Sequence, residues 1–559
     1  MEKRTIIAFV LSFLVLIFWS TLFQPPPRTS REGEEKAKTD LKTAAAPSRE
    51  NSSLGQSDNT KALQGEGDRL IAPLAENAEA KKVIVDTPLY RAEFSTAGPT
   101  ITSFKLKRYR QSTAKGSPPV ELVHLKNSSG GLVEMAFQPI TARNPQRIIY
   151  QTDQESIILK EGSSPQDLIF RAVTAEGLIL TQTFRIHPDK YPIDLNLVFK
   201  NSTNRSLDGK VSGSIQNLPP EKSGGYSSFS GLALLLDEKL KEVPPKKMKD
   251  EKSFSGRIDW MAYEDHHFMT ALIPEIREKA QARGRLTPSG AVVGTYASSP
   301  FSIPPGGVFT ARFTLYLGPR DLTILKSLGK DLDRAINFGW FDWIAKPLLY
   351  TLRFFYKYVG NYGVAIIILT VLIKILFWPL THKSYKSMKE MQKLQPHMAR
   401  LREKYKNNKE QLNKELMSLY KTYKVNPLGG CLPMLIQIPV FFALFRILGN
   451  AIELRHAPFV LWINDLSAPD RLFHFPFKIP LMAPPYGIPV LTLLMGASML
   501  IQQKMTPTPG DPAQAKLMMF LPLVFTVMFI NFPSGLVLYW LTNNILSIGQ
   551  QYRIMKSSS

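Results

Sequence analysis

The sequence has little cysteine. One residue of 559, Cys431, carries a thiol, so no intramolecular disulfide can form. Cys431 lies within an apolar run, and an apolar site disfavours the thiolate that a catalytic cysteine needs. We expect it to be a small core residue.

Recognisable catalytic motifs are also missing. The sequence contains no G-x-x-x-x-G-K-[ST] loop, no metal-ligand cluster and no hydrolase-type triad. His266 and His267 are adjacent, and neighbouring residues on a strand face opposite sides, so they would make a poor metal pair. We therefore expect no enzyme activity, no metal and no cofactor.

Acidic residues are outnumbered. The formal charge is +23, and the basic residues cluster beside apolar runs, which favours a membrane over nucleic acid as the partner. Residues 1–23 combine a basic start with an apolar run and predict an uncleaved anchor, with a cleaved signal peptide as the alternative. Residues 24–80 are polar and poor in aromatics, which is typical of a flexible linker.

Residues 81–320 have a different texture. Short runs such as "KVIVDTPLYRAEFST", "GLILTQTFRI" and "VFTARFTLYLG" alternate apolar with polar residues between turn formers. They predict one large antiparallel β domain of the sandwich type. Residues 321–346 then predict an amphipathic helix on the bilayer surface, with Trp340 and Trp343 at the interface.

The long apolar runs lie in residues 347–552. They predict five further spans, at 361–380, 428–449, 487–503, 516–532 and 536–551, giving six with the N-terminal anchor. The spans at 487–503 and 516–532 are short for a bilayer core of about 30 Å. Short spans thin the bilayer or occupy a region that is already thin.

The loop between the first two of these spans sets the orientation. It carries twelve Lys or Arg and four Glu, whereas residues 450–486 carry three of each sign. The positive-inside rule places the first loop, both termini and the tail at 553–559 in the cytoplasm, and the β domain outside. Residues 382–425 predict a helical hairpin with an apolar seam. The apolar face of its first helix either packs as an ordinary seam or offers a docking surface. That face consists of Met388, Met391, Leu394 and Met398.

Lys374 is a positive charge inside the span at 361–380. A central lysine costs about 2.5–3.5 kcal/mol on the insertion scale, and the interiors of the six predicted spans hold no Asp or Glu to pair with it. It either snorkels to the cytoplasmic surface or lies in a hydrated groove. Other polar residues could line such a groove: Thr370, Gln437, Ser498, Gln502, Thr542, Asn543 and Ser547.

The C-terminal region contains six distinctive segments in order: "NYGVAIIILTVLIKILFWPLT", "MQKLQP", "KVNPLGGCLPMLIQIPVF", "LWINDLSAPD", "DPAQAKLMMFLPLVFTVMF" and "FPSGLVLYWLTNN". Through these segments the chain resembles a known family, the YidC/Oxa/Alb3 membrane protein insertases in their Gram-negative bacterial form.

The resemblance implies a multi-domain fold: a periplasmic β super-sandwich and an α-helical bundle of six spans with a five-helix insertase core. It also implies a hydrophilic groove open to the cytoplasm and to lipid. Lys374 stands where bacterial relatives usually have arginine, Thr370 and Gln437 match groove-side positions, and three residues match positions that face the substrate helix: Phe441, Met495 and Trp540.

We therefore expect a multi-pass insertase of the bacterial inner membrane. By resemblance its partners would be nascent membrane proteins, the Sec translocon, the ribosome or targeting machinery, and the lipid bilayer, with no nucleic acid bound by the chain itself. The rival interpretation is a small-solute transporter or channel, which would predict inverted repeats or a chain of acidic residues. The sequence shows neither.

Overall fold

The computed structural model describes residues 80–556 except 126–129, 141–147, 175, 221–228, 424, 426–431 and 507–511. The predicted anchor at 1–23, the linker up to residue 79, and Cys431 lie outside the described residues.

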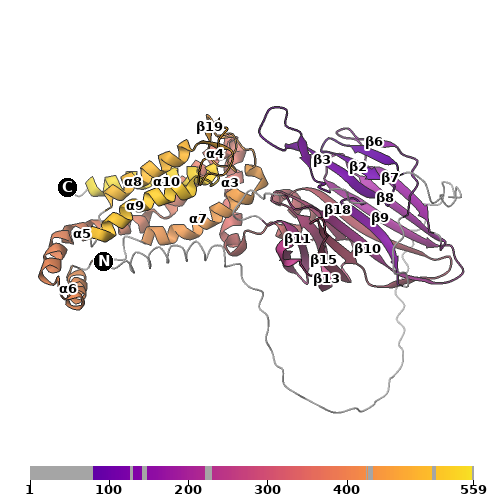
Figure 1. Ribbon diagram of the computed structural model, residues 1–559, viewed down its shortest axis with the longest axis horizontal. Helices are drawn as coiled ribbons and strands as arrows, with labels where there is room; N and C mark the ends of the chain where they lie inside the picture. Colours follow the sequence, from indigo (N-terminus) through magenta and orange to yellow (C-terminus); the bar gives the residue numbers. More distant parts are fainter. Residues whose placement is uncertain are drawn as a thin grey trace, which may run out of the picture. The chain divides into compact units, whose positions relative to one another are not determined.

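The β domain contains a small and a large sheet (Figure 1). The small sheet has the strand order β4 (Pro119–Glu121), β3 (Thr100–Arg110), β2 (Tyr90–Ser95), β1 (Lys82–Asp86) and β6 (Ser156–Ile158). The prediction of an all-antiparallel domain was wrong at one edge, where β1 and β6 pair in parallel. The crossover between them runs through β2 to β5 and so has the length that a parallel pair requires.

The large sheet has thirteen strands within the described part of the chain. Its main path is β17 (Phe301–Ile303), β10 (Leu207–Asn217), β16 (Val292–Ala297), β15 (Lys279–Leu286), β13 (Lys252–Glu264), β14 (Phe268–Pro274), β18 (Val308–Pro319), β9 (Pro192–Asn201), β8 (Leu178–Ile186) and β7 (Gln166–Val173). Strands β11 (Gly231–Leu236), β12 (Lys239–Val243) and β5 (Val133–Pro139) pair beside this path.

The two sheets bury a shared aromatic core. Phe94 on β2 meets Phe184 on β8 edge to face, with ring centroids 5.1 Å apart, and also contacts Phe170 on β7. Strand β8 alternates buried residues with half-buried or exposed ones, as expected where one face meets the core. The runs quoted from the sequence all form strands, which confirms the β-sandwich prediction.

The two histidines do not lie on a strand. They occupy the turn between β13 and β14, where the rings of His266 and His267 stack with centroids 4.1 Å apart. The argument that they face opposite sides was therefore wrong, because a turn does not alternate its side chains. Within the described residues, no group of three potential ligands could hold a metal ion.

The segment predicted as one interfacial helix at 321–346 is broken. Helix α2 (Leu322–Leu328) is capped by Asp321, whose side chain accepts hydrogen bonds from two backbone amides, and it ends at Gly329 with φ +68°. Short 3₁₀ turns at Leu332–Ala335 and Gly339–Phe341 follow. The long amphipathic helix is α3 (Asp342–Val359).

The helical core begins with α4 (Tyr362–Leu376), which continues into α5 (Trp378–Lys404) after a 65° bend. Helix α6 (Lys409–Thr422) completes the predicted hairpin, followed by α7 (Leu432–Asn450). A short hairpin of β19 (Leu472–Phe475) and β20 (Tyr486–Ile488) precedes α8 (Val490–Met505), α9 (Pro512–Phe529) and α10 (Ser534–Lys556).

Candidate functional site

Lys374 lies in the last turn of α4 and points into the helical bundle. The residue is only 9% exposed, and its Nζ donates to the Ser547 hydroxyl on α10 at 2.7 Å. Ser547 in turn donates to the Asn543 carbonyl at 2.7 Å. Of the described residues, none brings a carboxylate within 4.0 Å of this amine. The amine is therefore buried, and the Ser547 hydroxyl to which it donates is neutral.

Tyr385, near the start of α5, joins the same cluster. Its hydroxyl interacts with Ser547 and with Gln502 on α8, and burial raises its pKa. Sequence reasoning missed Tyr385 because the residue lies in the basic hairpin segment. Tyr385 follows the 65° bend that separates α4 from α5. Residues from four helices, α4, α5, α8 and α10, therefore meet at one polar cluster.

The other predicted polar residues have separate partners. Thr370 is buried one turn before Lys374, and its hydroxyl donates to the Ile366 carbonyl of its own helix. The Gln437 amide donates to the Tyr539 hydroxyl. Ser498 accepts from the Asn544 amide at 2.9 Å. These contacts link helices α7, α8 and α10.

The C-terminal half of α10 presents a polar face. Asn544, Ser547, Gln550 and Gln551 are all buried. Gln550 exchanges hydrogen bonds with Thr381, and the Gln551 amide donates to the Met505 carbonyl at 2.7 Å. Sequence reasoning included Ser547 but missed the other three, although their spacing of three and four residues marks one helix face. Thr542 and Asn543 on the same helix are half-buried.

The residues expected to face the substrate helix separate into two environments. Phe441 on α7 and Trp540 on α10 are half-buried and meet edge to face, with centroids 5.0 Å apart. Phe529 on α9 lies against both rings. Met495 on α8 is fully buried. The aromatic pair thus keeps some exposed surface, whereas Met495 packs inside the bundle.

The hairpin uses most of its predicted docking residues for its own core. Met391, Leu394 and Met398 are buried together with Val425, and three residues of α6 pack against them: Leu416, Leu419 and Tyr420. Met388 lies outside this cluster and is half-buried.

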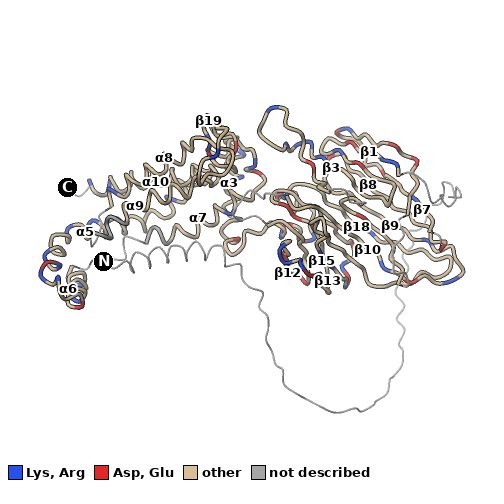
Figure 2. Tube along the Cα trace, viewed as in Figure 1, with Lys and Arg blue, Asp and Glu red and all other residues tan. Residues whose placement is uncertain are grey.

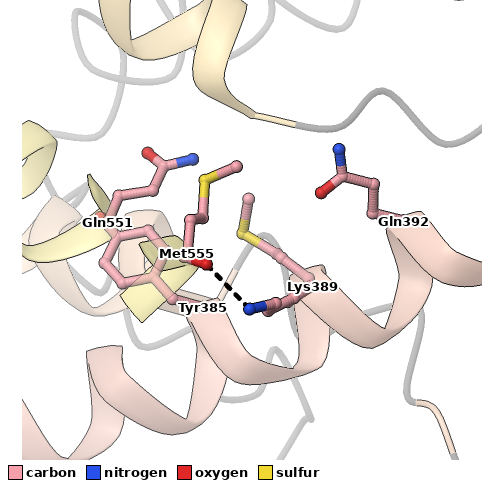
Figure 3. Close-up of a pocket in the computed structure, with 6 residues that line it drawn as sticks. Tyr385, Lys389, Gln392, Gln551 and Met555 are labelled. Atoms are coloured by element: carbon pink, nitrogen blue, oxygen red, sulfur yellow. Dashed lines mark hydrogen bonds between the residues drawn. The ribbon is translucent and has the colours of Figure 1, made fainter. Parts of the chain in front are cut away.

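Met388 lines a small pocket between α5 and the end of α10, with Tyr385, Lys389, Gln392, Gln551 and Met555 (Figure 3). Lys389 Nζ donates to the Met555 carbonyl at 2.9 Å, which fastens the hairpin to the last turn of α10. Figure 2 shows Lys and Arg along α5 and α6, while α8 and α9 are almost free of charge.

Over the described part of the chain, no single helix is long and apolar enough to cross a membrane by itself, whereas α4 and α5 meet the criterion only as a bent pair.

Comparison with known proteins decides the family. Residues 82–351 match the YidC periplasmic domain, and residues 354–559 match the family described as 60Kd inner membrane protein. The membrane protein insertase YidC of Syntrophobacter fumaroxidans is 41% identical, with 99% of each chain covered. That of Syntrophus aciditrophicus is 42% identical, with 100% of each chain covered. The chain belongs to the YidC family of membrane protein insertases.

A solved structure of an active YidC insertase aligns with 85% of this chain and 93% of its own, at 18% identity and a TM-score of 0.36. The YidC relatives make this chain a bacterial inner-membrane protein with a periplasmic domain. The predictions of the family, of the β-plus-helical fold and of insertase function are confirmed, and the transporter alternative is not favoured.

Proposed function

We propose that this YidC-family insertase receives the polar flank of an incoming segment at Lys374. The observation that carries the proposal is the environment of Lys374: its amine is buried in the bundle and donates to the neutral hydroxyl of Ser547. A buried charge with only a neutral partner is costly, and a carboxylate offers a stronger, charge-assisted hydrogen bond.

The cluster around Lys374 also suits exchange of partners. Ser547 accepts from Lys374 and donates to its own helix, so its hydroxyl remains bonded when the lysine turns to another acceptor. Lysine is well suited to this task, since its ammonium is a compact charge on a flexible stem. The burial of the amine inside the bundle favours a groove charge over a snorkelling lysine.

The apolar part of the segment would leave sideways into lipid. Helices α4, α8 and α9 expose large apolar side chains, among them Leu372, Leu494 and Phe520. Transfer of an apolar helix from water to lipid is itself favourable, so the proposed mechanism requires no nucleotide. The half-buried Phe441 and Trp540 would contact that helix on its way.

The cytoplasmic partners belong to the same proposal. The hairpin is basic and fastened to α10, and its pocket around Met388 would contact apolar nascent segments delivered by the ribosome or by targeting machinery. Nascent membrane proteins and the bilayer are the partners that the mechanism requires, and the Sec translocon would hand over or receive some of them.

Substitutions at Lys374 test the mechanism. Lys374→Arg keeps the charge and should retain activity. Lys374→Leu should impair substrates with acidic flanks most, and Lys374→Glu should be worse for those substrates. The measurement is membrane insertion of paired test substrates, with acidic and neutral flanks, in cells depleted of the native insertase. Equal insertion of both substrates by Lys374→Leu and the parent at matched protein levels would refute the groove-charge mechanism.

The proposed orientation has its own test. A cysteine at Arg400 should be protected from an impermeant reagent added outside the inner membrane, and a cysteine at Lys200 should react. The reverse pattern would overturn the assignment of the hairpin to the cytoplasm.

A further inference from the structure

An exposed apolar surface lies on the loop that joins α7 to α8. Residues 472–489 read "LFHFPFKIPLMAPPYGIP", with no acidic residue. Three large apolar side chains are prominently exposed: Phe473 by 67%, Phe477 by 60% and Leu481 by 76%. An exposed apolar patch of this kind marks a surface that contacts another protein or a membrane.

The loop is held rigidly in this arrangement. Arg471 is buried, and it donates to the carbonyls of Pro485 at 2.8 Å and Ile530 at 2.9 Å. Asn531 accepts from the Ala483 amide at 2.7 Å and donates to the Leu481 carbonyl at 2.8 Å. The apolar side chains are therefore presented by a fixed scaffold that ties the loop to the end of α9.

The loop backbone has two unusual φ angles and few free N–H groups, and the second feature suits a lipid environment. Phe473 and Leu481 have φ of +54° and +62°, which bulky residues rarely adopt. Prolines at 476, 480, 484, 485 and 489 have no N–H group that would need a partner. The β19–β20 pairing and the Arg471 and Asn531 contacts satisfy other backbone groups, as a non-aqueous environment requires.

The loop lies at the opposite end of α10 from the cytoplasmic hairpin. Asp470, next to the loop, accepts from the Leu491 amide at the start of α8, and Pro469 bridges Pro533 just before α10. Lys389 of the hairpin instead contacts Met555 near the other end of α10. In Figure 1, β19 and α6 accordingly lie at opposite ends of the helical region.

The neighbouring helices are short for a bilayer. Helix α8 has 16 residues and α9 has 18, which correspond to about 24 Å and 27 Å, against a hydrocarbon core of about 30 Å. In a bilayer, a short α8 would bring the segment that immediately precedes it toward the depth of the lipid interface. An apolar surface there continues the exposed apolar face of α8, which includes Leu494.

We propose that residues 472–489 form a lipid-embedded wedge in the outer leaflet. The wedge extends the apolar surface beyond the ends of α8 and α9, which are too short to span the hydrocarbon core. Phe477 and Leu481 lie among the acyl chains, and Lys478 lies near the headgroups. The inference rests on the family's membrane location and, for the choice of leaflet, on the proposed orientation, and it is independent of the role of Lys374.

Spin labelling of the full-length protein in phospholipid nanodiscs tests this proposal. With Cys431→Ser as the background, a nitroxide is attached at Phe477→Cys or Leu481→Cys, and its collisions with oxygen and with a water-soluble nickel chelate are compared. Ile276→Cys and Ile158→Cys are matched controls, because these apolar residues of the β domain are 66% and 69% exposed. Leu494→Cys on α8 serves as the lipid-facing reference.

The wedge predicts an oxygen-to-nickel collision ratio at Phe477 and Leu481 that is several-fold above the β-domain controls and close to the Leu494 reference. A ratio equal to that of the controls would place the loop in water and overturn the proposal. Low collision with both reagents and an immobilised spectrum would show that protein covers the loop, either a second copy or another part of this chain, and would also overturn it.

Discussion

Replacing Arg320 should reveal how the β domain tolerates a buried carboxylate. Glu264 at the end of β13 is fully buried, and its Oε2 lies 2.9 Å from Arg320 Nη2. Arg320 also donates to the carbonyls of Asp265 at 3.0 Å and Ala335 at 2.5 Å. Burial raises the pKa of Glu264 to about 7, Arg320 opposes that shift, and the Glu242 carboxylate adds to it.

The sign of the pH dependence follows from that pKa. Folded Glu264 binds its proton more tightly than the unfolded chain does, so stability falls as pH rises from about 4.5 to about 7 and is level above 7. In Arg320→Met the opposing cation is gone and the folded pKa lies higher still. Stability should then continue to fall above pH 7, by about 1.4 kcal/mol per pH unit until the new pKa is reached.

The expected magnitudes differ on the two sides of pH 7. At pH 6 the Glu264 carboxyl is largely protonated, and Arg320→Met costs mainly the lost hydrogen bonds, about 1–3 kcal/mol. At pH 8 the carboxylate is left without its partner, and loss of one member of a buried ion pair costs about 3–5 kcal/mol.

Hydrogen exchange of the β13 and β14 amides in the full-length protein measures the local loss of stability caused by Arg320→Met at pH 6 and at pH 8. The rates are corrected for the intrinsic exchange rate at each pH. Arg320→Met combined with Glu264→Gln is the control, because it lacks the Glu264 carboxyl and leaves Glu242 as the buried carboxyl that responds to the lost cation. Its loss of stability should therefore differ less between pH 6 and pH 8 than the loss caused by Arg320→Met alone. An equal destabilisation by Arg320→Met alone at the two pH values would refute the reasoning.

Two further predictions concern the helical bundle. Tyr385→Phe and Ser547→Ala should each reduce insertion of an acidic-flanked substrate, whereas Ser547→Thr, which keeps the hydroxyl, should insert it normally. Because both residues act through the lysine, neither Tyr385→Phe nor Ser547→Ala should reduce insertion further in the Lys374→Leu background. Gly496→Ala would place a Cβ 2.2 Å from Thr526 Oγ1 and should destabilise the α8–α9 contact by about 1–3 kcal/mol in detergent unfolding. Gly549→Ala, in the exposed interior of α10, meets nothing within 4 Å and should be neutral or stabilising by up to about 1 kcal/mol.

Local sequence patterns determined the kinds of element and their order. Alternating apolar residues in "GLILTQTFRI" produce β8 because one face of a strand must meet the core. The methionine and leucine spacing in the basic loop at 382–425 produces the α5–α6 hairpin, because an apolar stripe on one face of a helix must also be buried. Lys374 was also identified as the unusual charge, since a lysine inside an apolar run is costly wherever the chain folds.

Tertiary structure decided the partners, because they are distant in the chain. Lys374 and Ser547 are 173 residues apart, and the bend after α4 brings Tyr385 to the same cluster. His266 and His267 stack because they fall in a turn, and the identity of these two residues does not indicate where the strand ends. The apolar loop at 472–489 is likewise given its shape by Asn531, which lies beyond two further helices. Periodicity reports which face of an element is buried, but only the folded chain determines what that face meets.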